Sequence, residues 1–222
     1  MMKPMLLLLV AATLAGCAFG QKHDYLHARP TLDYTGKARL ALAVHDQRPY
    51  VVSHDKDADF VGLSRAGYGN PYDVSTASGH PLADDMASVL AAALGRSGAE
   101  VTMVKVAPGA SRAAAVRSLL STPAEKAVLL SLHEWKSDTY TNSELIYDVE
   151  MEILNRRGDV LAKKRAQGTD QLGGSFWNPP AHAREAVPPA FQRKIEDLYF
   201  GDIARALNEP DAHASAAEGQ HD

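Results

Sequence analysis

The stretch Leu145–Thr169, LIYDVEMEILNRRGDVLAKKRAQGT, decides the fold. Apolar side chains alternate with polar ones through its first half, as in a strand with one buried and one wet face. A turn rich in Asn, Gly and Asp follows, and the chain returns as a second strand, so the stretch predicts an antiparallel hairpin. We predict the register in which Glu152 lies opposite Lys163 and Glu150 opposite Arg165. This register pairs unlike charges and places the apolar residues of both strands on the same face.

The periodicity outside the hairpin predicts one domain. The predicted elements are strands 38–45, 100–106, 127–135, 144–155 and 160–170, and helices 79–96, 111–120 and 188–208. Ser78 is the expected cap of the first helix, and Pro188–Pro189 the expected start of the last. Residues 50–78 are expected to form a long ordered loop, with at most a short hairpin. The order β-α-β-α-β-β-β-α predicts an α+β fold with helices packed on a mixed sheet.

The amino terminus has the features of an export signal. Lys3 precedes an apolar run, residues 5–12, that is too short to span a bilayer and closes on Leu14-Ala15-Gly16-Cys17. This tetrapeptide resembles the bacterial lipobox, in which the cysteine receives a diacylglyceryl group before the signal is removed. The resemblance implies that residues 1–16 are cleaved and that Cys17, the single cysteine, is lipidated. An ordinary signal peptide with a chance cysteine is the alternative.

A lipidated Cys17 would fix the location and the domain limits. Three acyl chains exceed what stable attachment to a membrane face requires. No aspartate follows Cys17, and such an aspartate is the usual retention signal for the inner membrane, so we expect an outer-membrane, periplasm-facing protein. Residues 17–37 lack periodicity and predict a lipidated tether. The domain is then expected at 38–208, with a disordered tail at 209–222.

Composition excludes several classes of function. The chain has 222 residues and a net charge of −4, which offers no basic surface for nucleic acid. Its nine histidines are scattered and form no His-Glu-x-x-His motif, so neither a metal nor another cofactor is expected. No Gly-x-Ser-x-Gly elbow is present, and the sequence assigns no catalytic residue.

Two kinds of residue remain as candidates for function. Asp46 and Arg48 follow the first predicted strand, where they form either a catalytic or anion-binding pair or, more commonly, a brace for a loop. Aromatic residues on loops either form a binding surface or cover the edge of a small core, and both readings stay open. The aromatic candidates are Tyr68, Tyr72, Trp135 and Trp177.

Several features together resemble the YajG-type outer-membrane lipoproteins. They are the lipobox at Cys17, the strand Leu40–Val44 followed by Asp46 and Arg48, the dipeptide Val61-Gly62, the helix Leu82–Leu94, and the Trp135 strand with its hairpin. The resemblance covers most of the mature domain. It implies an envelope lipoprotein, from a family with no settled biochemical role.

The leading hypothesis is a non-enzymatic module, anchored to the membrane by its lipid, that binds or assembles with a protein of an envelope complex. Its oligomeric state stays open. The rival is an envelope hydrolase or carbohydrate-active enzyme that uses Asp46, Arg48 and nearby carboxylates. A deep cleft lined by Asp46, His133 and Glu134 would favour the rival, because enzymes gather titratable groups in one pocket.

Overall fold

Two long antiparallel strands, β6 (Lys126–Thr139) and β7 (Asn142–Asn155), form the centre of the sheet in the computed structural model, which describes residues 20–66 and 68–210. A third long strand, β8 (Val160–Gly174), pairs with β7. Glu152 lies opposite Lys163 and Glu150 opposite Arg165, so the predicted register is confirmed. The unlike charges across the hairpin, together with its alternating apolar face, therefore predicted the pairing correctly.

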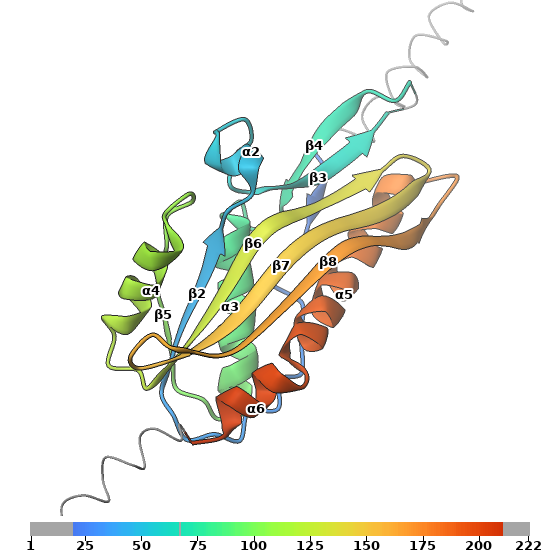
Figure 1. The fold of residues 1–222 in the computed structure, drawn as a ribbon. Helices are drawn as coiled ribbons and strands as arrows, with labels where there is room; N and C mark the ends of the chain where they lie inside the picture. Colours follow the sequence, from blue (N-terminus) through green and yellow to red (C-terminus); the bar gives the residue numbers. More distant parts are fainter. Residues whose placement is uncertain (1–19, 67, 211–222) are drawn as a thin grey trace, which may run out of the picture.

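Two shorter strands lie end to end along the other edge of β6 (Figure 1). β2 (Leu40–Asp46) runs parallel to its first half and β3 (Phe60–Arg65) parallel to its end. Beyond them lie β5 (Val101–Met103), paired with β2, then β4 (Pro71–Thr76), paired with β3, and β1 (Lys22–His23), paired with β4. The sheet is therefore mixed, with eight strands among the described residues.

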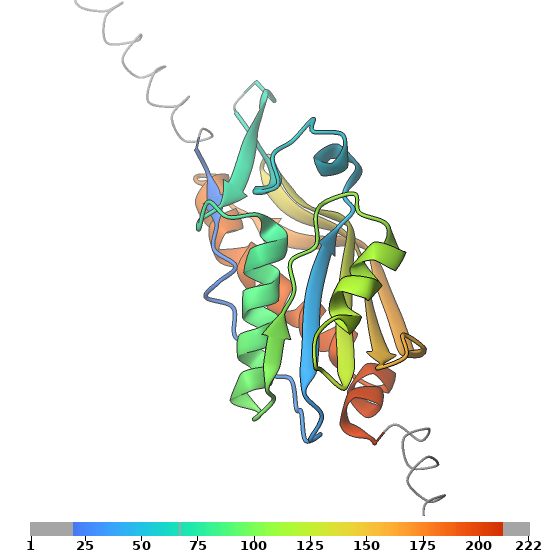
Figure 2. The same cartoon turned by 90° about the vertical axis from the view of Figure 1, so that its left-hand side faces the viewer.

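The helices cover both faces of the sheet and make the fold α+β, as predicted. The main core lies under α3 (Leu82–Arg96), α5 (Pro179–Tyr199) and α6 (Asp202–Asn208). α4 (Arg112–Leu120) packs on alanines of the opposite face, and Figure 2 shows α3 and α4 on either side of β2. Within residues 20–66 and 68–210, no helix combines the length and apolarity needed to cross a bilayer.

The last predicted helix is wrong at its start. We placed its beginning at Pro188–Pro189, but these prolines lie inside α5, which begins at a second proline pair, Pro179–Pro180. The Asn178 side chain caps that true start by accepting a hydrogen bond from the Ala181 N–H at 3.1 Å. The helix also ends earlier, because Gly201 adopts a φ of +88° and separates α5 from α6.

Two further expectations fail around residues 50–82. The segment predicted as a long loop contains a short helix, α2 (Pro49–Val52), and the β3–β4 hairpin. The short hairpin predicted within it is confirmed, but the helix was not predicted. Ser78 does not cap α3, which begins at Leu82. Its hydroxyl donates instead to the buried Asp85 carboxylate at 2.8 Å.

The predicted tether is part of the domain wherever the structure describes it. Residues 22–34, here called the N-terminal strap, add strand β1 to the sheet and then run along α5. The strap buries four apolar side chains, namely Tyr25, Ala28, Leu32 and Tyr34. The domain thus begins about sixteen residues earlier than predicted. Cys17, the signal and the tail from residue 211 lie outside the described residues.

Candidate interaction surface

Asp46 and Arg48 form a buried structural ion pair. Their side chains are 2% and 0% exposed, and Arg48 meets both carboxylate oxygens of Asp46 at 2.9 and 2.7 Å. Arg48 also donates to the carbonyls of Phe60 at 2.6 Å and Ala58 at 3.1 Å. Burial opposes the charged form, but the hydrogen bonds and charge of Asp46 outweigh it and raise the pKa of the guanidinium. The pair braces the chain between β2 and β3, which is the structural reading of these residues, and its burial leaves neither side chain open to a ligand.

Glu134 is also engaged within the fold. Its carboxylate accepts the Tyr50 hydroxyl at 2.6 Å and pairs with Lys136 at 3.0 Å. Asp46 and Glu134 are thus engaged in separate internal contacts, and Asp46 is buried away from solvent. This geometry gives the rival no support.

Trp135 belongs to the core and not to a binding surface. It is 1% exposed, and its indole N–H donates to the Tyr25 hydroxyl at 3.1 Å. Its ring also meets Phe191 edge-on at 5.7 Å between centroids. The surface prediction failed because β6 continues four residues past its predicted end, and because the N-terminal strap and α5 cover this part of the strand.

The remaining predicted aromatics differ in exposure. Tyr68 is 98% exposed in the turn between β3 and β4, whereas Tyr72, on β4 opposite Ser64, is half-buried. Trp177 is 90% exposed in the connection between β8 and α5, and its ring meets that of Phe176 edge-on at 5.3 Å. Two of the four predicted aromatic candidates are therefore fully available to a partner.

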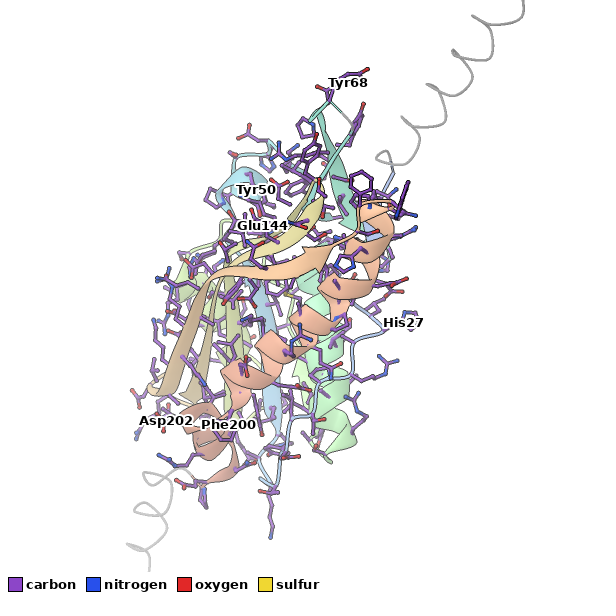
Figure 3. The ribbon with its side chains drawn as sticks, turned by 90° about the vertical axis from the view of Figure 1, so that its right-hand side faces the viewer. His27, Tyr50, Tyr68, Glu144, Phe200 and Asp202 are labelled. Atoms are coloured by element: carbon purple, nitrogen blue, oxygen red, sulfur yellow. The ribbon has the colours of Figure 1, made fainter. Side chains whose placement is uncertain are left out.

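Strand register brings the exposed aromatic turns to one end of the molecule. Ser64, near the end of β3, lies beside Thr139 at the end of β6, so the turns that follow both strands are neighbours. Asn142, at the start of β7, lies opposite Gly174, which ends β8. We call this the aromatic end, and its exposed aromatic residues are Tyr68, Tyr140, Phe176 and Trp177. Figure 3 shows Tyr68 at one extremity and Phe200 near the other.

A second surface, the α3–β5 groove, escaped sequence reasoning. It measures about 260 Å³ and lies between α3 and the edge strand β5. Val44, Ala87, Met103 and Val106 supply apolar walls, and the ion pair between Lys105 and Asp84, at 2.8 Å, lies at its rim. The alanine-rich face of α3 was visible in the sequence, but the pairing of β5 with β2 was not.

A buried histidine fastens the N-terminal strap to the sheet. His23 Nε2 and the Ser137 hydroxyl are 2.9 Å apart, and both residues are buried. Burial, aided by the positive charge of Arg184, lowers the pKa of His23 to about 4, so this imidazole is neutral near pH 7. Across the described part of the chain, no three His, Cys, Asp or Glu side chains form a metal-binding group.

Comparison with known proteins gives distant structural similarity only. No family model and no curated protein matches the chain. Protein XCC0632 from Xanthomonas campestris, of family DUF330, is 12% identical with a TM-score of 0.48 over 91% of this chain and 98% of its own. Protein CT253 from Chlamydia trachomatis is 15% identical with a TM-score of 0.45, covering 78% of this chain and 96% of its own.

One structural neighbour is named as a lipoprotein. Lipoprotein GNA1162 from Neisseria meningitidis is 11% identical, with a TM-score of 0.28 over 70% of this chain and 99% of its own. At this level of similarity the neighbours assign neither a family nor a function, so the function has to be argued from the molecule's own surfaces.

Proposed function

We propose that this protein is a lipid-anchored, periplasm-facing lipoprotein of the outer membrane that acts without catalysis, by holding a protein partner of the cell envelope. The anchor is the lipid on Cys17, implied by the lipobox-like Leu14-Ala15-Gly16-Cys17. The partner binds at the α3–β5 groove and the adjacent sheet edge.

The open edge of β5 is the observation that carries the partner-binding part of this proposal. β5 is the last strand in the order, paired with β2 alone within the described chain. The Leu40 N–H donates to the Glu100 carbonyl, and the Val104 N–H donates to the Leu42 carbonyl. The carbonyl of Glu100 and the N–H of Val104 therefore point toward β2. Because strand backbone groups alternate in direction, the N–H and carbonyl of Met103 turn outward. An extended partner segment can add there as a further strand.

The groove beside this edge suits the side chains of such a segment. Met103 is 55% exposed and lines the groove together with small side chains of α3, such as Ala83 and Ala87. In strand addition the backbone supplies affinity and side-chain pockets supply specificity. We therefore expect a partner segment with apolar residues that enter the groove, and a polar residue near Lys105 and Asp84.

The anchor is tested with the Cys17→Ser variant. Only the thiol can form the diacylglyceryl thioether, and the chain has one cysteine. Wild-type protein should incorporate a palmitate analogue and fractionate with the outer membrane, while Cys17→Ser should lose the label and remain unprocessed. Label that persists on Cys17→Ser, or wild-type protein found free in the periplasm, would refute the lipoprotein assignment.

Partner binding is tested by photo-crosslinking in whole cells. A photoreactive residue replaces Lys105 at the groove, and a matched control replaces Val160, which is 46% exposed at the start of β8, the opposite edge strand. Met103→Pro removes one outward N–H and keeps the inward hydrogen bonds, so it should abolish the adduct without unfolding the domain. Equal adducts at residues 105 and 160, or adducts that survive Met103→Pro, would exclude strand addition at β5.

A further inference from the structure

The N-terminal strap fixes which end of the domain is nearest to Cys17. The Arg29 N–H donates to Gln192 at 3.2 Å and the Thr31 N–H to Glu196 at 2.9 Å, so the strap and α5 run in the same direction. His23 lies further back along the same path, near Arg184. Going backward along the strap thus leads to the start of α5, next to Phe176 and Trp177.

The length of chain between Cys17 and the domain is very short. Gly20 is the first described residue, and three residues span at most about 10 Å. Lys22 lies opposite Ser75 in parallel strands, so moving back along β1 leads toward the β3–β4 turn. Cys17 precedes Lys22 by five residues, and Asn70, in the β3–β4 turn, precedes Ser75 by the same number. The chain before Lys22 is therefore long enough for Cys17 to reach the level of that turn.

The end that faces Cys17 is the aromatic end. Tyr68, Phe176 and Trp177 are 98%, 79% and 90% exposed there, and Tyr140 is 50% exposed in the neighbouring turn. Figure 1 shows the β3–β4 turn, the β6–β7 turn and the β8–α5 connection toward the same end, away from α6. Tyrosine and tryptophan favour the membrane–water interface, because each combines an apolar ring with a polar group.

From this juxtaposition we infer that the aromatic end docks on the surface of the lipid bilayer that holds Cys17, with the side chains of Tyr68, Phe176 and Trp177 in the headgroup region. The inference rests on the proposed lipid anchor. A lipid within about 10 Å of Gly20 leaves no room for a second protein layer between this end and the membrane. The domain would then stand with α6 pointing away from the bilayer and the α3–β5 groove at its side.

The two tryptophans make this docking measurable on the intact lipidated protein. Trp135 is 1% exposed and serves as an internal reference, whereas Trp177 is 90% exposed. The protein is reconstituted into phosphatidylethanolamine and phosphatidylglycerol vesicles, with and without lipids brominated near the glycerol end of their acyl chains. We expect the brominated lipids to quench most of the Trp177 emission and spare Trp135, and the vesicles to protect Trp177 from aqueous iodide. Trp177→Phe should remove the lipid-quenched component.

A matched pair of variants provides an independent readout. Tyr68→Cys and Phe200→Cys each place one thiol on a highly exposed aromatic position, at opposite ends of the molecule (Figure 3). Once Cys17 is acylated, an environment-sensitive dye can react only with the new thiol. The dye at residue 68 should shift to the blue on vesicles, and the dye at residue 200 should not.

The possible failures are distinct. Protein that stays in the supernatant when vesicles are sedimented, and takes up dye at Cys17, refutes the lipid anchor and the docking together. Protein that sediments with vesicles but leaves Trp177 open to iodide and unquenched by lipid keeps the anchor and overturns the docking. Equal dye shifts at residues 68 and 200 also overturn it, because the contact would then have no preferred end.

Discussion

The buried interior and the aromatic end contain the same residue types in opposite surroundings. Each has an arginine that meets both oxygens of an aspartate, Arg48 with Asp46 inside and Arg65 with Asp138 at the end. The inner side chains are at most 2% exposed, whereas Arg65 and Asp138 are 35% and 20% exposed. The same two-point hydrogen bonding between arginine and aspartate thus forms a buried structural brace in one region and a partly solvated surface pair in the other.

The tryptophans repeat the contrast. Trp135 meets Tyr25 of the strap and Phe191 of α5, while Trp177 lies in a connection that neither element covers. Aromatic content near strand ends therefore says little about exposure on its own. What decides it is whether a distant segment packs over the site, and the following predictions test that difference from the largest effect to the smallest.

The largest effect is expected from Asp46→Ala. The substitution leaves the fully buried Arg48 guanidinium without its counter-charge, and breaking such a pair costs about 3–5 kcal/mol of unfolding free energy. Urea unfolding followed by circular dichroism measures this loss. A loss below about 1 kcal/mol would show that Arg48 is solvated, and would remove the distinction between the two regions.

The next effect is a dependence on pH through His23. Burial lowers the pKa of this histidine from 6.5 to about 4 in the folded protein. Between these pH values the unfolded state binds the additional proton, so stability falls as the pH drops and is fully retained above 6.5. The full difference corresponds to about 3 kcal/mol. His23→Gln should flatten this part of the urea-unfolding profile, and parallel profiles for both proteins would show that other groups cause it.

Local sequence signals predicted the central hairpin well, because its information lies in adjacent residues. The alternation of Val149, Met151 and Ile153 sets the buried face, and the charges opposite one another set the register. The face of the hairpin that we expected to be exposed to solvent is only partly exposed, because Glu152 is 2% exposed and pairs with Arg112 of α4. Packing by a helix from elsewhere in the chain is not visible in the hairpin's own residues.

The strap and the last helix were missed for the same reason. Tyr25, Leu32 and Tyr34 recur without helical or strand spacing, so no period revealed that they pack in the core. The sequence contains two proline pairs at which the last helix could begin, Pro179–Pro180 and Pro188–Pro189. The second pair lies inside α5, where Val187 and neighbouring side chains pack in the core. The error about the strap had a functional consequence, because it concealed how few residues separate Cys17 from the folded domain.

A smaller effect is expected from Asp138→Ala at the aromatic end. The substitution removes the partner of Arg65, but that side chain can turn into water, so the loss should stay below about 1 kcal/mol. Urea unfolding under the conditions used for Asp46→Ala gives a direct comparison. A loss as large as that of Asp46→Ala would mean that the hairpin tip is part of the folding core.

The smallest effect on stability is expected from Trp177→Phe. The side chain is 90% exposed, and surface substitutions of this kind usually stay within about 0.5 kcal/mol. The same variant should lose almost all iodide-quenchable tryptophan emission in detergent solution, because the remaining Trp135 is 1% exposed. Iodide titration and urea unfolding of one sample measure both quantities. Quenchable emission that persists in Trp177→Phe would mean that the strap opens over Trp135, and the two regions would then differ in dynamics and not only in burial.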